Sequence, residues 1–165
     1  MPEIIVIAHN IRSTHNVGAI FRTAEGFGIS KIILSGYTPY PRTINDSRLP
    51  HIADKLTKQI SKTALDAEKQ VPFEHLEEPP INRLKQNGYR IVALEQADSS
   101  ITLKDYHPPE KIALLLGEEV EGVDQALLNQ CEDIIEIPMV GQKESFNVSV
   151  ATGVALYALT TNSPI

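Results

Sequence analysis

The sequence predicts a single α/β domain whose mainly parallel sheet is flanked by helices. Short aliphatic runs alternate along the chain with segments whose apolar residues recur at helical spacing, and this alternation is typical of a parallel sheet. The length of 165 residues is close to the commonest size of one compact domain. Because no internal repeat, low-complexity tract or linker interrupts the pattern, we expect residues 1–165 to form one domain.

The N-terminal part is expected to contain two strands, a helix and a long loop. Residues 3–8 and 31–34 are β-branched or aliphatic runs and predict buried strands. Residues 16–27 predict a helix, which Asn16 can cap, because the apolar positions have helical spacing and glycines follow. Residues 37–50 are rich in proline and polar residues, and they predict an irregular loop of the kind that often carries function.

The rest of the chain continues the alternation. Further strands are expected at residues 71–75, 91–94, 112–116 and 134–137. Further helices are expected at residues 51–61, 79–88, 124–129 and 145–159. Asp124 and Ser145 are the expected N-caps of the last two helices, because their side chains can accept hydrogen bonds from the free N–H groups of a helix start.

Composition excludes several classes of protein. The chain has no apolar run near the roughly 20 residues of a membrane helix, and its first residues lack the basic start of a signal peptide. We therefore expect a cytoplasmic protein that does not contact a membrane. The one cysteine, Cys131, cannot form an internal disulfide and rules out a multi-cysteine metal site, so we expect no metal.

Charge is distributed unevenly along the chain, whose net charge is −6. Residues 1–62 carry eight Lys and Arg against four acidic residues, whereas residues 63–165 carry seven against seventeen. A weakly basic face on an acidic body suits a protein that touches a structured RNA at a few phosphates. On charge alone, chance explains the asymmetry equally well.

The first chemical motif, residues 10–24, leads from the first strand into the first helix. Free backbone N–H groups and the helix dipole favour anions there. Gly18 and Ala19 allow another backbone or a ligand to approach closely, and Arg22 could clamp a phosphate or a ribose. The alternative is an ordinary capped helix with a surface arginine.

The second motif, residues 114–123, places a glycine and then glutamates at the carboxyl end of a buried strand. Open α/β sheets bind ligands at this edge, where Gly117 would let the backbone lie against an adenine ring. The segment lacks the G-x-G-x-x-G pattern of a dinucleotide site. Its three glutamates suit a cationic or ribose-bearing ligand, and the alternative is an acidic turn without function.

The third motif, residues 137–151, joins the last strand to the last helix through a Pro/Gly turn. Ser145 and Asn147 begin that helix and face the same sheet edge as Gly117. For Ser145 the alternative is a capping role alone. Asn147 is harder to explain structurally, because Asn is an indifferent helix former in so apolar a segment.

In these segments the chain resembles the SpoU (TrmH-like) RNA methyltransferases of the SPOUT superfamily. The matching patterns are N-x-G-A-x-x-R-T-A at residues 16–24, L-x-L-G-x-E-x-x-G at 114–122 and I-P-M-x-G-x-x-E-S-x-N-V-S-V-A at 137–151. Their order also agrees, and the resemblance covers nearly the whole chain.

The resemblance implies a SPOUT-type α/β knot, in which the C-terminal segment threads through a loop to form a deep trefoil knot. Chains generally do not knot, so no property of the residues themselves predicts this feature. The resemblance also implies a homodimer with the first and last helices between the subunits. Small and aliphatic residues suit that packing, namely Gly18, Ala19, Ala151, Gly153, Val154 and Ala155.

The implied reaction transfers a methyl group from S-adenosylmethionine to a ribose 2'-hydroxyl of RNA, with tRNA favoured over rRNA. The implied catalytic residues are Arg22, Asn16, Glu119, Ser145 and Asn147. The implied cofactor-binding residues are Leu94, Leu116, Gly117, Ile137, Met139, Ser145, Phe146 and Asn147. Arg22 is expected to bind the neighbouring phosphate rather than to act as a base, because guanidinium keeps its proton in proteins.

RNA selection is expected to come from the core itself or from a partner subunit, since the sequence predicts no separate RNA-binding extension. The candidate RNA-binding residues are Arg12, Arg22, Arg42, Arg48 and His51. One alternative is a catalytically silent module of the same fold that binds RNA and S-adenosylmethionine. Another is a nucleotide-dependent oxidoreductase, which the absence of a dinucleotide pattern after the first strand disfavours.

Overall fold

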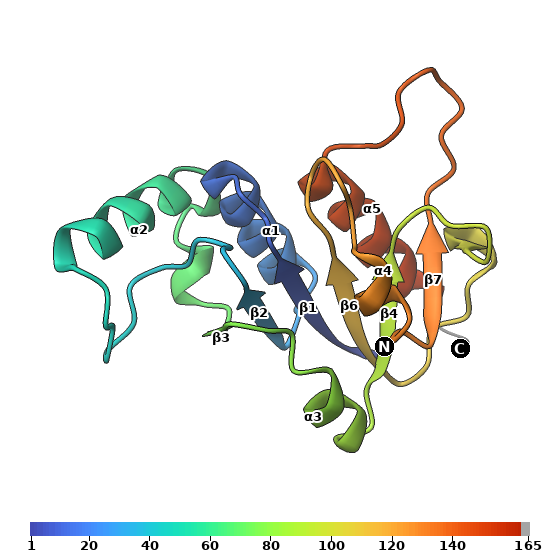
Figure 1. Ribbon diagram of the computed structural model, residues 1–165, viewed down its shortest axis with the longest axis horizontal. Coiled ribbons are helices and arrows are strands. Elements are labelled where there is room, and N and C mark those ends of the chain that lie inside the picture. Colours follow the sequence, from blue (N-terminus) through green and yellow to red (C-terminus); the bar gives the residue numbers. More distant parts are fainter. Residues whose placement is uncertain (163–165) are drawn as a thin grey trace.

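The computed structural model describes residues 1–162, which form a seven-stranded sheet between two layers of helices (Figure 1). The strand order is β3-β2-β1-β6-β4-β7-β5, and neighbouring strands pair in parallel throughout. The strands are β1 (Glu3–His9), β2 (Lys31–Ser35), β3 (Phe73–Leu76), β4 (Arg90–Leu94), β5 (Ile101–Thr102), β6 (Lys111–Leu116) and β7 (Asp133–Glu136). The α/β class expected from the sequence is confirmed.

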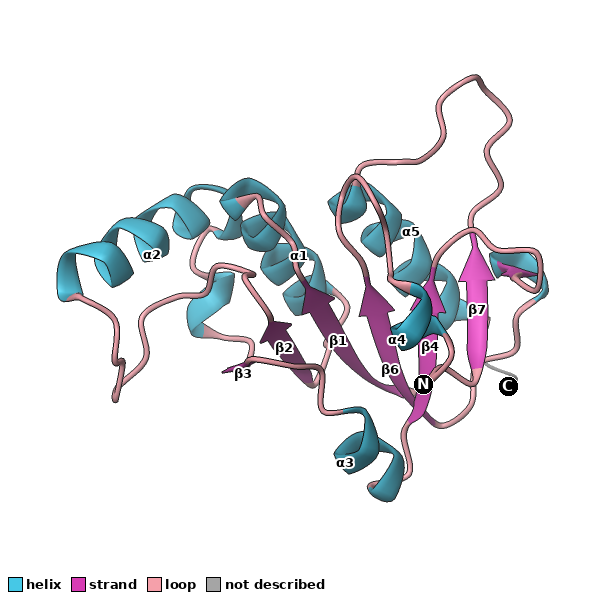
Figure 2. Cartoon of the chain, viewed as in Figure 1, coloured by secondary structure: helices cyan, strands magenta, loops and turns pink. Residues whose placement is uncertain are grey.

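The helices cover both faces of the sheet and are joined by long loops (Figure 2). They are α1 (Thr14–Gly26), α2 (Pro50–Ala64), α3 (Ile81–Gln86), α4 (Gln125–Leu128) and α5 (Val148–Thr161), with 3₁₀ turns at Ala67–Lys69 and Leu103–Asp105. Among residues 1–162 there is no helix whose length and apolar character would allow it to cross a membrane.

Alternation along the strands divides the core into two clusters. Ile4, Val6 and Ala8 of β1 pack with buried residues of α1 and α5 on one face. Ile5 and Ile7 point to the other face and pack with the apolar side chains of α3 and α4. Both faces of the central strands are covered, which explains why β1 and β6 are continuous aliphatic runs.

The parallel arrangement brings all strand ends of one polarity to the same edge of the sheet. Ala8 of β1 lies opposite Leu116 of β6, and Leu94 of β4 lies opposite Ile135 of β7. The segments after these strands therefore begin side by side, although they are far apart in the sequence. Ligands of open α/β sheets bind at this edge.

Gly18 allows α1 and α2 of the same chain to pack closely. A side chain at this position would overlap Thr63 Oγ1 and the Ile60 carbonyl oxygen, so α1 and α2 can pack only because Gly18 has none. Ala155 is also fully buried in this chain's own core. The close approach expected at Gly18 is therefore present, but α2 of the same chain makes it. Gly18 and Ala155 are not part of a surface offered to another subunit.

The helix starts differ from those expected from the sequence. Ser13, not Asn16, caps α1: its Oγ accepts a hydrogen bond from Asn16 N at 3.2 Å. The cap of α5 is Asn147, not Ser145, and its Oδ1 accepts from Ser149 N at 2.9 Å. Capping rules name suitable residue types, and each of these regions contains more than one of them.

Candidate active site

The loops that follow β4, β6 and β7 enclose a cavity of about 340 Å³. We call it the acidic pocket, because six glutamates line it (Glu95, Glu118, Glu119, Glu121, Glu136 and Glu144). Its apolar walls come from Leu94, Leu116, Ile137, Phe146, Val148 and Ala151. Within residues 1–162, no three His, Cys, Asp or Glu side chains are arranged to hold a metal ion. The glutamates give the pocket a negative field.

The loop after β6 is a tight turn that closes on itself. Glu118 N donates to Gly122 O at 3.0 Å, and Gly122 N donates to Glu118 O at 2.8 Å. A side chain at Gly117 would overlap Gly122 and Val123, and Gly122 itself has a φ of +72°. The absence of a Cβ at Gly117 therefore makes this turn possible. Gly117 also lines the pocket, and its expected contact with a ligand remains a prediction.

Glu95 and Gln96 join the three loops, and neither residue was predicted from the sequence. The Glu95 carboxylate accepts from Val123 N at 2.9 Å and from Gln96 N at 2.8 Å. Gln96 Nε2 donates to Glu144 O at 2.9 Å. Their signal was available: both are polar and directly follow a predicted buried strand at the ligand-binding edge.

Glu119 connects the acidic pocket to the start of α1. Its carboxylate accepts hydrogen bonds from Arg12 N at 3.2 Å, Ser13 N at 3.3 Å and Asn16 Nδ2 at 3.2 Å. Burial acts to raise the pKa of Glu119, but these N–H donors outweigh it and hold the pKa below its usual range. Glu119 is therefore an anion at neutral pH, bound at the positive end of a helix.

Asn16 and Asn147 complete a hydrogen-bonded chain across the three motifs. Asn147 Nδ2 donates to Asn16 Oδ1 at 3.2 Å, while Asn16 Nδ2 donates to Glu119. Asn147 Oδ1 also caps α5. One network thus fixes the starts of α1 and α5 and the turn after β6.

The other predicted cofactor residues lie around this network. Leu94, Leu116, Gly117, Ile137, Ser145 and Phe146 line the acidic pocket. Met139 does not line it; it lies in the loop of residues 137–147, which projects beyond the sheet (Figure 1). Asn147 borders the pocket between two lining residues, Phe146 and Val148.

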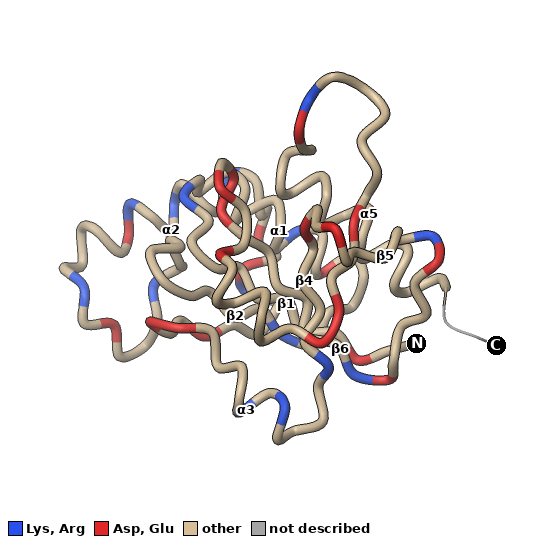
Figure 3. Tube along the Cα trace, turned by 45° about the vertical axis from the view of Figure 1, so that its right-hand side comes forward, with Lys and Arg blue, Asp and Glu red and all other residues tan. Residues whose placement is uncertain are grey.

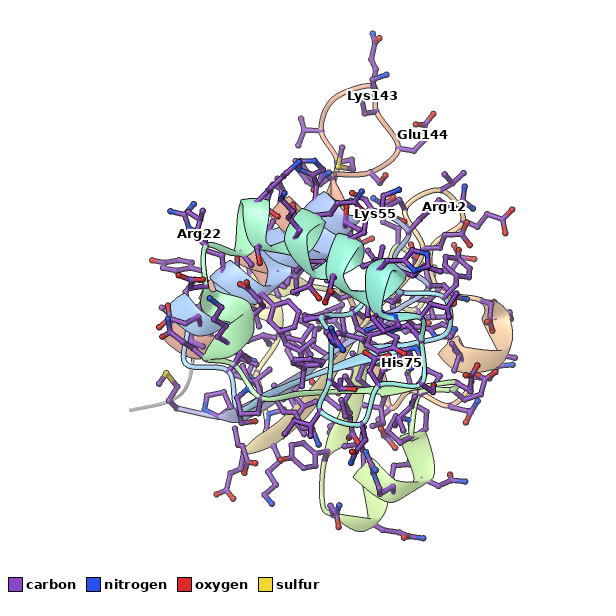
Figure 4. All side chains as sticks on the ribbon, turned by 90° about the vertical axis from the view of Figure 1, so that its left-hand side faces the viewer. Arg12, Arg22, Lys55, His75, Lys143 and Glu144 are labelled. Carbon is purple, nitrogen blue, oxygen red and sulfur yellow. The ribbon has the colours of Figure 1, made fainter. Side chains whose placement is uncertain are left out.

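Arg22 lies outside the pocket of its own chain. It is exposed on α1, six residues beyond Asn16, which corresponds to about 9 Å along a helix axis. In Figure 4 its side chain points outward on the opposite side of the molecule from Arg12. Arg22 does not line the acidic pocket of its own chain, so the phosphate or ribose clamp expected from the sequence remains a prediction.

The predicted RNA-binding residues differ in their exposure and in their pairing within the chain. Arg12 and His51 are exposed, and Arg42 is paired with Asp54 at 2.9 Å. Arg48 is held inside the chain: its guanidinium donates to Asp46, Tyr40 O and Pro41 O. The Lys and Arg residues of the first part of the chain recur along α2 and the loop before it (Figure 3).

Comparison with known proteins identifies a family and several relatives of this chain. Residues 3–157 match the SpoU rRNA Methylase family. A relative from Staphylococcus haemolyticus, named for the TrmH family of tRNA/rRNA methyltransferases, is 29% identical over 155 residues, which are 93% of this chain and 56% of the relative. The chain thus spans about half the length of the curated relatives that it matches.

Two solved structures share the fold. An AdoMet-bound rRNA methyltransferase from Sinorhizobium meliloti superposes with a TM-score of 0.78 at 23% identity, covering 95% of this chain and 55% of that one. A structure described as giving insights into the 2-OH methylation of C/U34 on tRNA superposes with a TM-score of 0.75 at 21% identity, covering 98% and 96%. Because the family match extends over almost all of the sequence, this chain belongs to the SpoU rRNA methylase family.

Proposed function

We propose that this chain is an S-adenosylmethionine-dependent RNA methyltransferase that modifies a ribose 2'-hydroxyl, with tRNA favoured over rRNA. The observation that carries the proposal is the hydrogen-bonded chain Glu119–Asn16–Asn147 at the border of the acidic pocket. It joins residues from three separate motifs, and folding alone does not require three such residues to meet at a ligand-binding edge.

The acidic pocket fits S-adenosylmethionine. Its volume of about 340 Å³ lies within the usual range of small-molecule sites. Leu94, Leu116 and Ile137 would hold the adenine, while Ser145 and loop backbone groups would offer polar contacts. When bound, the cofactor supplies a methyl group on a positively charged sulfonium. The surrounding glutamates favour that positive charge.

The chain's own residues act by positioning. The network of Glu119, Asn16 and Asn147 holds two helix starts against the pocket, and fixing reactants in line supplies much of the rate gain in such reactions. Glu119 is a poor general base, because its carboxylate already accepts three hydrogen bonds. We infer that the proton of the 2'-hydroxyl passes to a phosphate oxygen or to water.

We also propose a homodimer in which Arg22 serves the pocket of the other copy. Val150, Val154 and Tyr157 are 53%, 44% and 62% exposed and follow one another at helical spacing along α5. Monomeric proteins rarely expose a continuous apolar stripe, so a second copy would cover it. The implied trefoil knot remains a prediction of the family resemblance.

The ribose and tRNA assignments draw on the family patterns. The structure concerned with 2-OH methylation on tRNA is matched over 98% of this chain and 96% of that one, and its description supports the choice of a tRNA ribose. The name of the Staphylococcus relative includes both tRNA and rRNA. The choice between the two RNA classes therefore needs a direct test.

The test incubates the full chain with S-adenosylmethionine labelled on its methyl group and with tRNA or rRNA from cells that lack the protein. We expect label in 2'-O-methylnucleosides of the tRNA fraction, and its loss in the Arg22→Ala and Asn147→Ala variants. Label in a base would overturn the ribose assignment, and label confined to rRNA would overturn the tRNA preference. Cofactor and RNA binding without transfer would identify the silent module instead.

A further inference from the structure

A second cavity lies over the carboxyl ends of β1, β2 and β3, beside the acidic pocket. Its volume is about 610 Å³. We call it the aromatic groove and define it by its lining, which comprises residues 12–14 and 36–40 with Arg48, Leu56, Gln59 and His75. Among these described lining residues none is acidic, and two are arginines. Arg48 is paired with Asp46, so the exposed Arg12 is the cation that the groove offers to an anion, unlike the glutamates of the pocket next to it.

One wall of the groove is a fixed aromatic stack. The rings of Tyr40 and His75 lie 4.0 Å apart between centroids and are nearly parallel at 15°. The Arg48 guanidinium lies 3.5 Å from the Tyr40 ring centroid. Because Arg48 is also bound to Asp46 and to two carbonyl oxygens, this wall is preformed.

Tyr37 stands at the opening of the groove with its ring available. The residue is 51% exposed, and its backbone N–H donates to Asn10 Oδ1 at 3.1 Å. The Arg12 guanidinium lies 5.9 Å from the ring centroid. An exposed aromatic ring with a hydrogen-bonded backbone, next to an exposed cation, is an arrangement on which proteins stack unpaired bases.

Arg12 links the groove to the acidic pocket. Its backbone N donates to Glu119, and its guanidinium lies 3.9 Å from Glu118. Both glutamates line the pocket. The weak contact with Glu118 leaves the Arg12 side chain 79% exposed. A polynucleotide with one ribose at the pocket would therefore pass Arg12 and reach Tyr37 with a neighbouring nucleotide.

We propose that the aromatic groove binds one unpaired nucleotide of the RNA substrate, with its base stacked on Tyr37 and its phosphate held by Arg12. This inference rests on the proposed function, because it concerns a nucleotide next to the modified ribose. Stacking accepts any base, so the groove would select an unpaired strand rather than a particular sequence. Together with the pocket, it would restrict the enzyme to RNA positions whose neighbour can leave its helix.

The experiment measures the affinity of the full chain for bulk tRNA by fluorescence anisotropy. We expect Tyr37→Ala to weaken binding by about ten-fold and Tyr37→Phe to retain it, since an aromatic ring suffices for stacking. Arg12→Ala should lower the slope of log affinity against log salt by about one. A short unstructured RNA with a single 2-aminopurine should be quenched by the wild-type chain and not by Tyr37→Ala.

Two controls distinguish failure of the groove proposal from failure of the proposed methyltransferase function. Ile44→Ala alters a fully exposed residue of the same loop and should leave RNA affinity unchanged. The affinity of Tyr37→Ala for S-adenosylmethionine, measured by calorimetry, should equal that of the wild type. Unchanged RNA affinity in Tyr37→Ala, or an equal loss in Ile44→Ala, would overturn the inference and leave the methyltransferase proposal standing. A wild-type chain that binds the cofactor but no RNA would overturn both.

Discussion

The acidic pocket and the aromatic groove occupy the same edge of one sheet but have opposite chemistry. The pocket lies over β4, β6 and β7 and is lined by six glutamates, whereas the groove lies over β1, β2 and β3 and is lined by arginines and aromatic rings. A sulfonium cofactor and an RNA strand carry opposite charges. Under the proposed function, this contrast would place the two ligands at separate parts of the sheet edge according to their charge, and the hydrogen bonds of Arg12 and Asn16 to Glu119 join the two parts.

The strongest test of this division removes the residue at the junction. Glu119→Ala leaves Arg12 N, Ser13 N and Asn16 Nδ2 without their acceptor, so the start of α1 loses its position against the pocket. We expect methyl transfer to fall by roughly 100-fold or more, since misplacement of about 1 Å has costs of that order. The rate is measured with saturating RNA and cofactor.

Stability controls accompany this variant. A buried hydrogen-bond donor left without an acceptor lowers the free energy of unfolding by about 1–3 kcal/mol. Because Glu119 is only partly buried, we expect the free energy of unfolding of Glu119→Ala to fall by an amount near the lower end of this range. Glu110→Gln, an exposed site at the opposite edge of the sheet, should leave the melting temperature and the rate unchanged. Full activity in Glu119→Ala would show that the pocket and α1 work independently.

A smaller change should affect the pocket and spare the groove. Gly122 has a φ of +72°, and a side chain there would overlap the Glu95 carboxylate. Gly122→Ala therefore opens the connection between the loops after β4 and β6, and we expect about ten-fold weaker binding of S-adenosylmethionine. Gly26→Ala is the matched control, because nothing lies within 4 Å of the added atom. Weaker tRNA binding in Gly122→Ala would contradict the separation of the two sites.

Local patterns in the sequence predicted most of the architecture. The central strands are continuous aliphatic runs because both of their faces are buried. Such a run is recognised from the local sequence alone, as in β6. The two-residue strand β5 and the 3₁₀ turns escaped detection, because segments so short contain no periodicity. The extent of α5 was nearly right, but its start was misplaced by three residues, since Ser145 and Asn147 are both good caps.

The site was harder to predict from the sequence than the fold, because its contacts join segments that are distant in the chain. Motif positions identified Asn16, Glu119 and Asn147, but only the folded chain shows that they bond to one another. Glu95 acts through Val123, 28 residues away, and Arg48 acts within its own loop rather than at the surface. The sequence shows which residues are charged. Only the folded structure shows which guanidinium or carboxylate groups are already paired within the chain.

Arg48→Lys should weaken the groove without affecting the pocket. A lysine ammonium cannot reproduce the planar fork that binds Asp46 and two carbonyl groups while lying on Tyr40. We expect a loss of about 1–2 kcal/mol in the free energy of unfolding and a few-fold loss of tRNA affinity. Cofactor affinity should not change. Arg83 is an exposed residue of α3 that pairs with Glu74 of β3, and Arg83→Lys should alter the free energy of unfolding by no more than about 0.5 kcal/mol.

The smallest expected effect concerns the pH dependence of the junction. The pKa of Glu119 is below its usual range in the folded chain, so its ionised form favours folding above the unfolded pKa of about 4.3. This contribution is lost as the pH falls through the lower, folded pKa. We therefore expect the difference in unfolding free energy between wild type and Glu119→Gln to be constant near neutral pH and to shrink on acidification. Urea unfolding at a series of pH values measures it. A difference that stays constant down to the most acidic pH would mean that the N–H groups of Arg12 and Ser13 do not hold an anion, and the pocket and the groove would then meet without an electrostatic link.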